Sequence, residues 1–228
     1  MDGAALSRLD AALPTNLAAS LRDVKPADAA KAIASLYAEL DYVHPFRDCN
    51  SRTLRAFTHQ LAKDAGWHLD WASLGQSEQD RNLLYWARDR AVNKLALPHV
   101  GSEATMKRLI RSLHAIPVSP TLHELIEKVL RPSRAVAFPT RPETIALQAH
   151  PELETAYQTV RAAATFFNAR FPGQRAKIEA GVDAVRSHVQ SQLNAGEITQ
   201  LSRGREVDQS TIGKSVASFT PRDRDTER

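Results

Sequence analysis

Residues 44–55 read HPFRDCNSRTLR, and they decide how the rest of the sequence is interpreted. The stretch places a histidine, a carboxylate, an amide and two arginines in a short polar loop that leads directly into the next helix. Backbone N–H groups at the start of a helix bind anions, and arginines add positive charge and forked donors. The pattern therefore favours a loop that holds a phosphate chain between two helices.

Two further side chains give this loop a chemistry. Asp48 is the candidate ligand for Mg²⁺, because magnesium is held by one or two carboxylates together with substrate phosphates. His44 stands at the beginning of the loop, where an imidazole can take a proton from an attacking hydroxyl. Together these groups indicate phosphoryl or nucleotidyl transfer. The alternative is a solvated connection between two helices that carries only surface charges and a capping residue.

The same residues resemble the signature of the Fic/Doc family, which is written HPFx(D/E)GNGRxxR. The positions that agree with it are His44, Pro45, Phe46, Asp48, Asn50, Arg52 and Arg55. The preceding LYAELDYV and the following AGWHLDW are also similar to that family, so the resemblance covers about residues 27–130. It does not extend to the helices that follow.

The resemblance implies an all-α, Fic-type helical bundle that transfers AMP from ATP to a Ser, Thr or Tyr hydroxyl of a target protein. It implies that His44 is the general base and that Asp48 binds the magnesium. It places Asn50 beside the α-phosphate. It places Arg52 and Arg55 at the β- and γ-phosphates.

Two residues depart from the signature, because Cys49 and Ser51 replace its glycines. Glycine permits positive φ and a close approach of the backbone to phosphate. Ser51 counts among the phosphate-binding candidates by its place in the loop, and we expect its change to matter more than that of Cys49. Doc-like relatives carry alanine and lysine at these two positions. We expect weakened AMP transfer. The alternatives are a catalytically inactive Fic-derived binding protein and a Doc-type protein phosphotransferase.

We interpret Phe46 as a core anchor that fixes the loop.

Two other features of the family concern the partners of the protein. Many Fic proteins carry a β-hairpin flap before the motif, but residues 1–24 show no alternation, so we expect the flap to be shortened or lost. The family's self-inhibitory motif, (S/T)xxxE(G/N), is missing from the sequence. If the protein is restrained, as in a toxin–antitoxin pair, we expect a separate antitoxin-like chain to restrain it.

The organisation of the chain follows from its prolines, glycines and apolar stripes. Hydrophobic residues make up 43% of the 228 residues, alanine and leucine are abundant, and only 9 glycines occur, which favours an all-α fold. We expect a Fic-like catalytic domain at 1–130, a proline-rich linker at 131–142 and a helical hairpin at 143–201. We expect a disordered, mixed-charge tail at 202–228.

The composition of the chain bears on disulfides, zinc sites, membrane association and nucleic-acid binding. One cysteine excludes an internal disulfide and a four-cysteine zinc site. The N-terminus lacks the pattern of a secretory signal, and no apolar run reaches about 18 residues, so we expect no membrane partner. A net charge of +4 does not demand nucleic acid, and we do not expect it. We expect a bacterial, cytoplasmic protein and leave secretion as an effector open.

Overall fold

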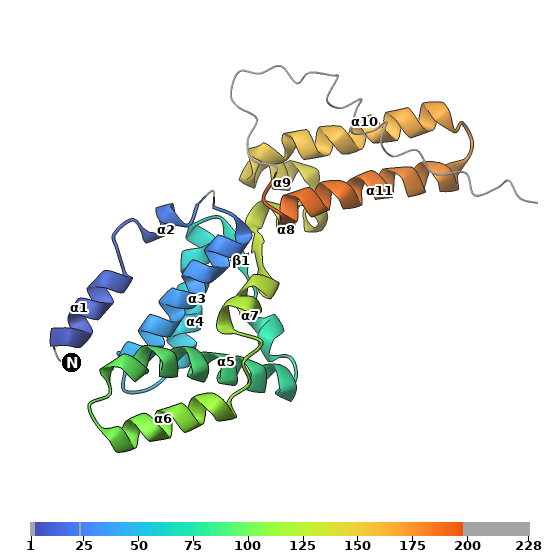
Figure 1. Cartoon of the computed structure of the whole chain (residues 1–228). Helices are drawn as coiled ribbons and strands as arrows, with labels where there is room; N and C mark the ends of the chain where they lie inside the picture. The colour runs from blue at the N-terminus through green and yellow to red at the C-terminus, as the bar shows by residue number, and fades with distance from the viewer. Residues whose placement is uncertain (1–2, 23, 198–228) are drawn as a thin grey trace, which may run out of the picture. The chain divides into compact units, whose positions relative to one another are not determined.

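The computed structural model describes residues 3–22 and 24–197, and helices dominate this part of the chain (Figure 1). The expected all-α fold class with a C-terminal helical hairpin is confirmed. A single two-stranded pair is the one sheet among the described residues. The chain divides into two units, Met1–Ser133 and Arg134–Arg228, which are described separately below. The predicted disordered tail, 202–228, lies outside the described residues.

The described residues of the N-terminal unit form seven α-helices and both strands. They are α1 (Gly3–Ala12), α2 (Leu17–Ser20), α3 (Pro26–Val43), α4 (Asn50–Asp64), β1 (Trp67–Leu69), α5 (Glu78–Ala96), α6 (Glu103–Ala115), α7 (Leu122–Val129) and β2 (Leu130–Pro132), with 3-10 turns at Trp71–Gly75 and Leu97–His99. Described residues before His44 form helices and turns, without a strand. None of the described helices is both long enough and apolar enough to cross a membrane.

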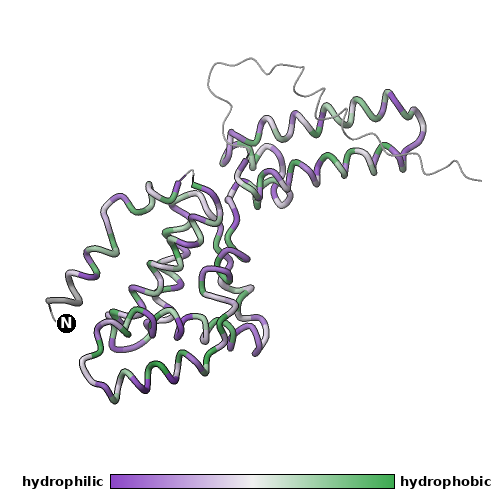
Figure 2. The backbone as a smooth tube through the Cα atoms, viewed as in Figure 1, coloured by the Kyte–Doolittle hydropathy of each residue, from purple (hydrophilic) through white to green (hydrophobic). Residues whose placement is uncertain are grey.

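Helix α3 is the centre of this unit, and it packs against α1, α4, α5 and α7. Pro26 occupies its first turn, where the missing N–H costs nothing. Ile33 and Tyr37 are fully buried on its apolar face. Figure 2 shows hydrophobic and hydrophilic residues alternating along the helices, as expected when each helix buries one side. The burial of α3 therefore fixes the position from which the 44–55 loop departs.

A small antiparallel sheet closes the unit. Trp67 pairs with Pro132 and Leu69 with Leu130, and all four residues are buried. The Trp67 indole Nε1 donates to the carbonyl of Leu21 at 2.8 Å, which attaches α2 to the sheet. Pro132 is tolerated because it ends a strand at the edge of the sheet.

The segment 131–142, assigned to a linker by its prolines, contains secondary structure. It includes part of β2 and α8 (Ser133–Thr140), with Pro139 in the last turn of that helix. Pro142 is the N-cap residue of α9 (Glu143–Ala149). Pro132 ends a strand and Pro142 precedes the first turn of α9, where the missing N–H is not needed. Pro139 cannot donate to the Ala135 carbonyl, and Gln190 Nε2 donates to that carbonyl instead at 2.9 Å. These three prolines therefore do not mark an unstructured segment.

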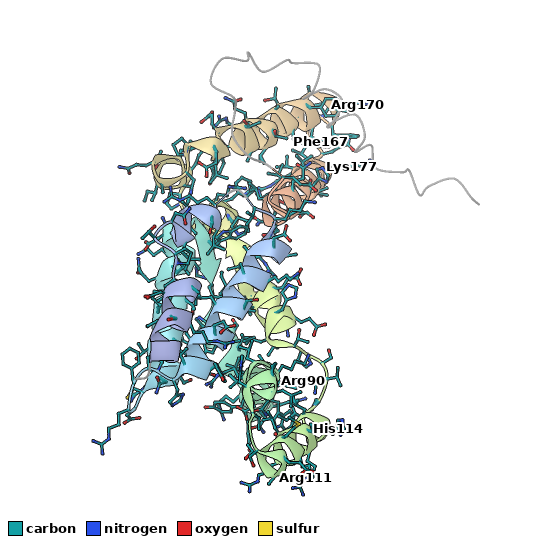
Figure 3. All side chains as sticks on the ribbon, turned by 60° about the vertical axis from the view of Figure 1, so that its left-hand side comes forward. Arg90, Arg111, His114, Phe167, Arg170 and Lys177 are labelled. Carbon is teal, nitrogen blue, oxygen red and sulfur yellow. The ribbon has the colours of Figure 1, made fainter. Side chains whose placement is uncertain are left out.

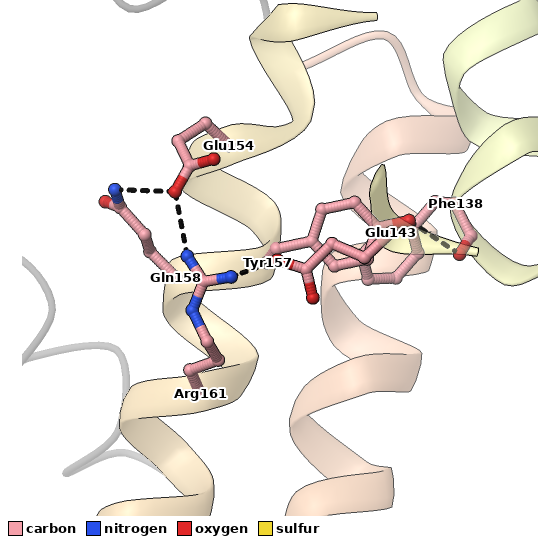
Figure 4. A network of polar contacts seen from close by, with 6 residues as sticks. All are labelled: Phe138, Glu143, Glu154, Tyr157, Gln158 and Arg161. Atoms are coloured by element: carbon pink, nitrogen blue, oxygen red, sulfur yellow. Dashed lines mark hydrogen bonds and ion pairs between the residues drawn. The ribbon is translucent and has the colours of Figure 1, made fainter. Parts of the chain in front are cut away.

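The C-terminal unit is built on α10 (Glu154–Arg170) and α11 (Arg175–Asn194), joined at Gly173, which has a φ of +76°. The two helices lie side by side (Figure 1). Figure 4 shows a polar network around the first half of α10. Arg161 pairs with Glu143 and Glu154, and the Tyr157 hydroxyl donates to the Phe138 carbonyl at 3.2 Å. The network joins α10 to α8 and α9, whereas buried apolar residues supply the core.

Gly181 on α11 allows close packing against Phe167 of α10. A Cβ at position 181 would lie 2.8 Å from three carbons of the Phe167 ring. We therefore expect Gly181→Ala to destabilise the C-terminal unit by about 1–3 kcal/mol, although alanine favours helices over glycine by about 1 kcal/mol. Thermal unfolding followed by circular dichroism measures the effect. The exposed neighbour Ala180 supplies the control, because Ala180→Gly reports helix propensity alone. A raised unfolding temperature for Gly181→Ala would contradict the prediction.

Candidate functional site

The loop at 44–49 begins and ends at residues in the left-handed region. His44 caps the C-terminus of α3 with a φ of 48°, and its N–H donates to the Leu40 carbonyl at 3.1 Å. Pro45 then prevents the helix from continuing. Cys49 precedes α4 with a φ of 63°. These two turns reverse the chain and place the start of α4 close to the end of α3.

Asn50 holds the loop in this shape. Its Oδ1 accepts from the Phe46 N–H at 3.0 Å, and its Nδ2 donates to the Phe46 carbonyl at 2.6 Å. The residue is 5% exposed. Asn50, assigned to the α-phosphate from the resemblance, thus has both ends of its amide bound to the loop backbone.

The interpretation of Phe46 as a core anchor is wrong, because its side chain is 48% exposed. The amide of Asn50 binds the backbone on both sides of the Phe46 Cα, so the loop does not depend on burial of the ring. The residue type suggested burial, whereas the hydrogen bonds of its backbone determine where it lies.

Three of the predicted site residues form the exposed side of the loop: His44, Asp48 and Arg52. The Asp48 Oδ1 accepts from the Cys49 N–H at 2.6 Å, and Arg52 Nη2 contacts the Cys49 Sγ at 2.6 Å. No side chain caps α4. The first N–H groups of a helix have no partner within it, so this start offers donors to an anion.

Ser51 and Arg55, the other two candidates, are partly buried on the inward side of α4. They lie near Tyr37, a fully buried residue of α3. Burial raises the pKa of the Tyr37 hydroxyl, while the positive charges of Arg88 and Arg55 oppose that rise. The structure therefore places the predicted site residues in one loop and its following helix, but on two sides of it.

A buried ion pair lies beneath the loop, and sequence reasoning missed it. Arg88 of α5 donates to both carboxylate oxygens of Asp41, with the closest contact at 2.8 Å. The side chains of Arg88 and Asp41 are 12% and 8% exposed. A signal was available: Asp41 follows Ile33, Tyr37 and Leu40 on the buried side of α3, and buried carboxylates are almost always paired.

The comparisons with known proteins concern this part of the chain. The model of the Fic/DOC family matches residues 4–62. The resemblance drawn from the 44–55 loop is confirmed, and the match overlaps its expected range, 27–130, at residues 27–62. The matched residues run from α1 into the last turn of α4.

A relative with a described activity shares a short stretch with the chain. Over 43 residues the sequence is 51% identical to the protein adenylyltransferase VbhT of Bartonella schoenbuchensis. The stretch is 19% of this chain and 9% of that relative, so the chain spans less than a tenth of the relative's length. No solved structure gives a significant match.

For metal binding, the 44–55 loop offers one carboxylate. The described residues contain no cluster of three or more His, Cys, Asp or Glu side chains that could enclose a metal ion. Asp48 is exposed, and one of its oxygens accepts only a backbone N–H. This arrangement fits Mg²⁺ shared with substrate phosphates and does not fit a metal held by protein ligands alone.

A separate cavity of about 500 Å³ lies in the same unit, between α3, α5 and α7. Its lining includes Lys31, Ala38, Ala87 and Arg90 but none of the predicted site residues. Figure 3 shows Arg90 on the side of α5 that faces α6. There its Nη1 donates to the Leu113 carbonyl at 2.8 Å. Arg90 thus supports the end of α6.

The two residues that replace glycines of the Fic/DOC signature differ in backbone strain. Cys49 has positive φ, which costs a non-glycine residue about 1–2 kcal/mol, whereas Ser51 lies within α4 in helical geometry. We expect Cys49→Gly to stabilise the unit by about 0.5–1 kcal/mol, since glycine's own chain entropy offsets part of the gain. We expect Ser51→Gly to destabilise it by about 0.5–1 kcal/mol.

Urea unfolding of the two variants beside the wild type measures both effects. Because the substitutions introduce the same residue two positions apart, each serves as the control for the other. The opposite pair of signs would show that the strain lies at Ser51.

Proposed function

We propose that this chain is a Fic-type protein adenylyltransferase, which transfers AMP from ATP to a Ser, Thr or Tyr hydroxyl of a target protein. One observation carries the proposal: the uncapped start of α4 lies beside exposed His44, Asp48 and Arg52, within a segment that matches the Fic/DOC family. The stretch shared with a protein adenylyltransferase supports AMP over other transferred groups.

In the proposed reaction, His44 removes the proton from the target hydroxyl as its oxygen attacks the α-phosphorus of ATP. The new bond is a phosphodiester to the target, and the bond between the α-phosphorus and the bridging oxygen breaks, so pyrophosphate leaves. His44 begins the loop and is exposed, so a protein hydroxyl can reach its imidazole without rearrangement of the core. General bases of this kind contribute about 10²–10⁴-fold to rates.

The remaining residues bind the nucleotide in this proposal. The N–H groups at the start of α4, including that of Ser51, face the phosphates, and Arg52 and Arg55 supply positive charge from the first two turns. Asp48 would hold Mg²⁺ together with phosphate oxygens, and the ion would neutralise phosphate charge. Asn50 keeps the loop in shape through Phe46 and acts on the phosphates through that loop.

The proposal includes partners and a compartment. The substrate partner is a protein that carries the modified hydroxyl, and a separate antitoxin-like chain would restrain the activity. The expected setting is the bacterial cytoplasm.

Labelled ATP tests the proposed reaction. The purified chain is incubated with bacterial lysate, Mg²⁺ and ATP labelled at either the α- or the γ-phosphate, and labelled proteins are separated by gel electrophoresis. Transfer from the α-label alone supports adenylylation, whereas transfer from the γ-label supports a Doc-type phosphotransferase. Transfer from neither, together with no difference by mass spectrometry between cells expressing wild type and His44→Ala, supports a non-catalytic binding protein.

A further inference from the structure

A single guanidinium group connects the two ends of the loop. Arg88 Nε and Nη2 bind the carboxylate of Asp41, which lies in the last turn of α3, three residues before His44. Its remaining nitrogen, Nη1, donates to the hydroxyl of Ser51 in the first turn of α4 at 3.3 Å. Arg88 itself belongs to α5, so it contacts the residues on both sides of the loop from a third helix.

The position of this guanidinium is strongly constrained. It is largely buried, and it lies 5.5 Å from the centre of the Tyr37 ring and 5.8 Å from that of Tyr85. A forked pair of bonds to a carboxylate fixes the plane of the group as well as its place. Because the guanidinium cannot easily move, its bond from Nη1 restricts the position of the Ser51 hydroxyl.

We propose that Arg88 is a positioning residue that sets the start of α4 relative to α3 through the Ser51 hydroxyl. The catalytic consequence rests on the proposed function: the same first turn supplies the N–H donors for the ATP phosphates. Ser51 stands where the family signature has glycine, and glycine has no acceptor for Arg88 Nη1. The serine is therefore part of a bond that this chain uses to fix its phosphate-binding turn.

Hydrogen exchange tests the proposal without any activity. The probe is the amide of Thr53, whose N–H donates to the Cys49 carbonyl at 3.0 Å and closes the first turn of α4. We expect Ser51→Ala to speed its exchange about tenfold, as loss of a hydrogen bond to a charged group predicts. We expect Arg88→Lys to do the same, because one ammonium group cannot hold Asp41 and Ser51 in the same geometry.

In the double variant Ser51→Ala/Arg88→Lys, exchange of the Thr53 amide is expected to match that in either single variant. Each substitution removes the same bond between Arg88 and Ser51. Arg81→Lys is the matched control: Arg81 lies on α5 and donates to the Gly75 carbonyl at 3.2 Å, away from the loop. Unchanged Thr53 exchange in Ser51→Ala, or additive effects in the double variant, would overturn the proposal. If Arg88→Lys does not fold, Ser51→Ala alone decides.

Kinetics then test the consequence for ATP. We expect both single variants to raise the KM for ATP about tenfold and to change kcat less, because the displaced turn binds phosphate while His44 is untouched. If the wild type transfers no AMP, the proposed function fails, but Thr53 exchange still decides whether Arg88 positions α4. If the wild type is active and the KM for ATP is unchanged in Ser51→Ala, Arg88 does not position the phosphate-binding turn.

Discussion

Replacing His44 by alanine is expected to lower AMP transfer at least about 100-fold, since loss of a general base costs roughly 10²–10⁴ in rate. The folded protein is expected to persist, because His44 is exposed and its ring is not part of the core. Transfer of label from α-labelled ATP to target protein measures the effect, and thermal unfolding confirms the fold.

Two variants sharpen this experiment. His44→Asn keeps a polar side chain that tolerates left-handed geometry better than alanine does, yet it cannot serve as the base. It should therefore be as inactive as His44→Ala. His68→Ala removes another exposed histidine of the same unit and should transfer AMP at the wild-type rate. Substantial activity in His44→Asn would show that the imidazole acts through loop conformation and not as a base.

Replacing Asp48 is expected to lower AMP transfer on the order of 100-fold, because a metal that stabilises phosphate charge contributes several kcal/mol to the transition state. The side chain also accepts the Cys49 N–H, so two variants are needed. Asp48→Asn removes the negative charge and keeps an oxygen acceptor, whereas Asp48→Ala removes both.

Transfer rates measured over a range of Mg²⁺ concentrations separate the two roles. Equal losses in both variants, with a weaker response to Mg²⁺, are expected if Asp48 binds the metal. Near wild-type transfer by Asp48→Asn, with loss in Asp48→Ala alone, would assign Asp48 to the shape of the loop instead.

Much of the helical layout could be predicted because helix ends depend on local residues. Pro26 begins α3, Pro45 ends it, and Gly66, with a φ of +85°, follows α4. The glycines at 173 and 196 end the two helices of the hairpin in the same way. Such residues act through their own φ and their own N–H, so neighbouring sequence suffices to locate them.

Elements that depend on distant contacts could not be predicted. Strand β2 is three residues long, too short to show alternation, and it exists because β1 lies beside it. Pro132, Pro139 and Pro142 suggested a linker instead. Helices α1 and α2 lack a clear apolar stripe, and α1 is held on α3 by contacts that include the Arg8–Glu39 ion pair.

The candidate loop could be located from residue types, but the backbone conformation and burial of its individual residues could not be predicted. Residue type does not give φ, so the sequence did not show that Cys49, and not Ser51, has the left-handed backbone. Asn50 was expected at the α-phosphate and Phe46 in the core, but the Asn50 amide is buried and the Phe46 ring is exposed. The two hydrogen bonds between the Asn50 amide and the backbone of Phe46 decide both positions.

The Asp41–Arg88 pair also has a consequence for inheritance. The Fic/DOC match ends at residue 62, so a gene fusion that copied only that segment would deliver a buried negative charge without its counter-charge. A fusion protein with this segment would be less stable, because a buried charge without its partner costs about 3–5 kcal/mol. Lineages that keep an acid at 41 should therefore keep a base at 88, and those that lose one should neutralise the other.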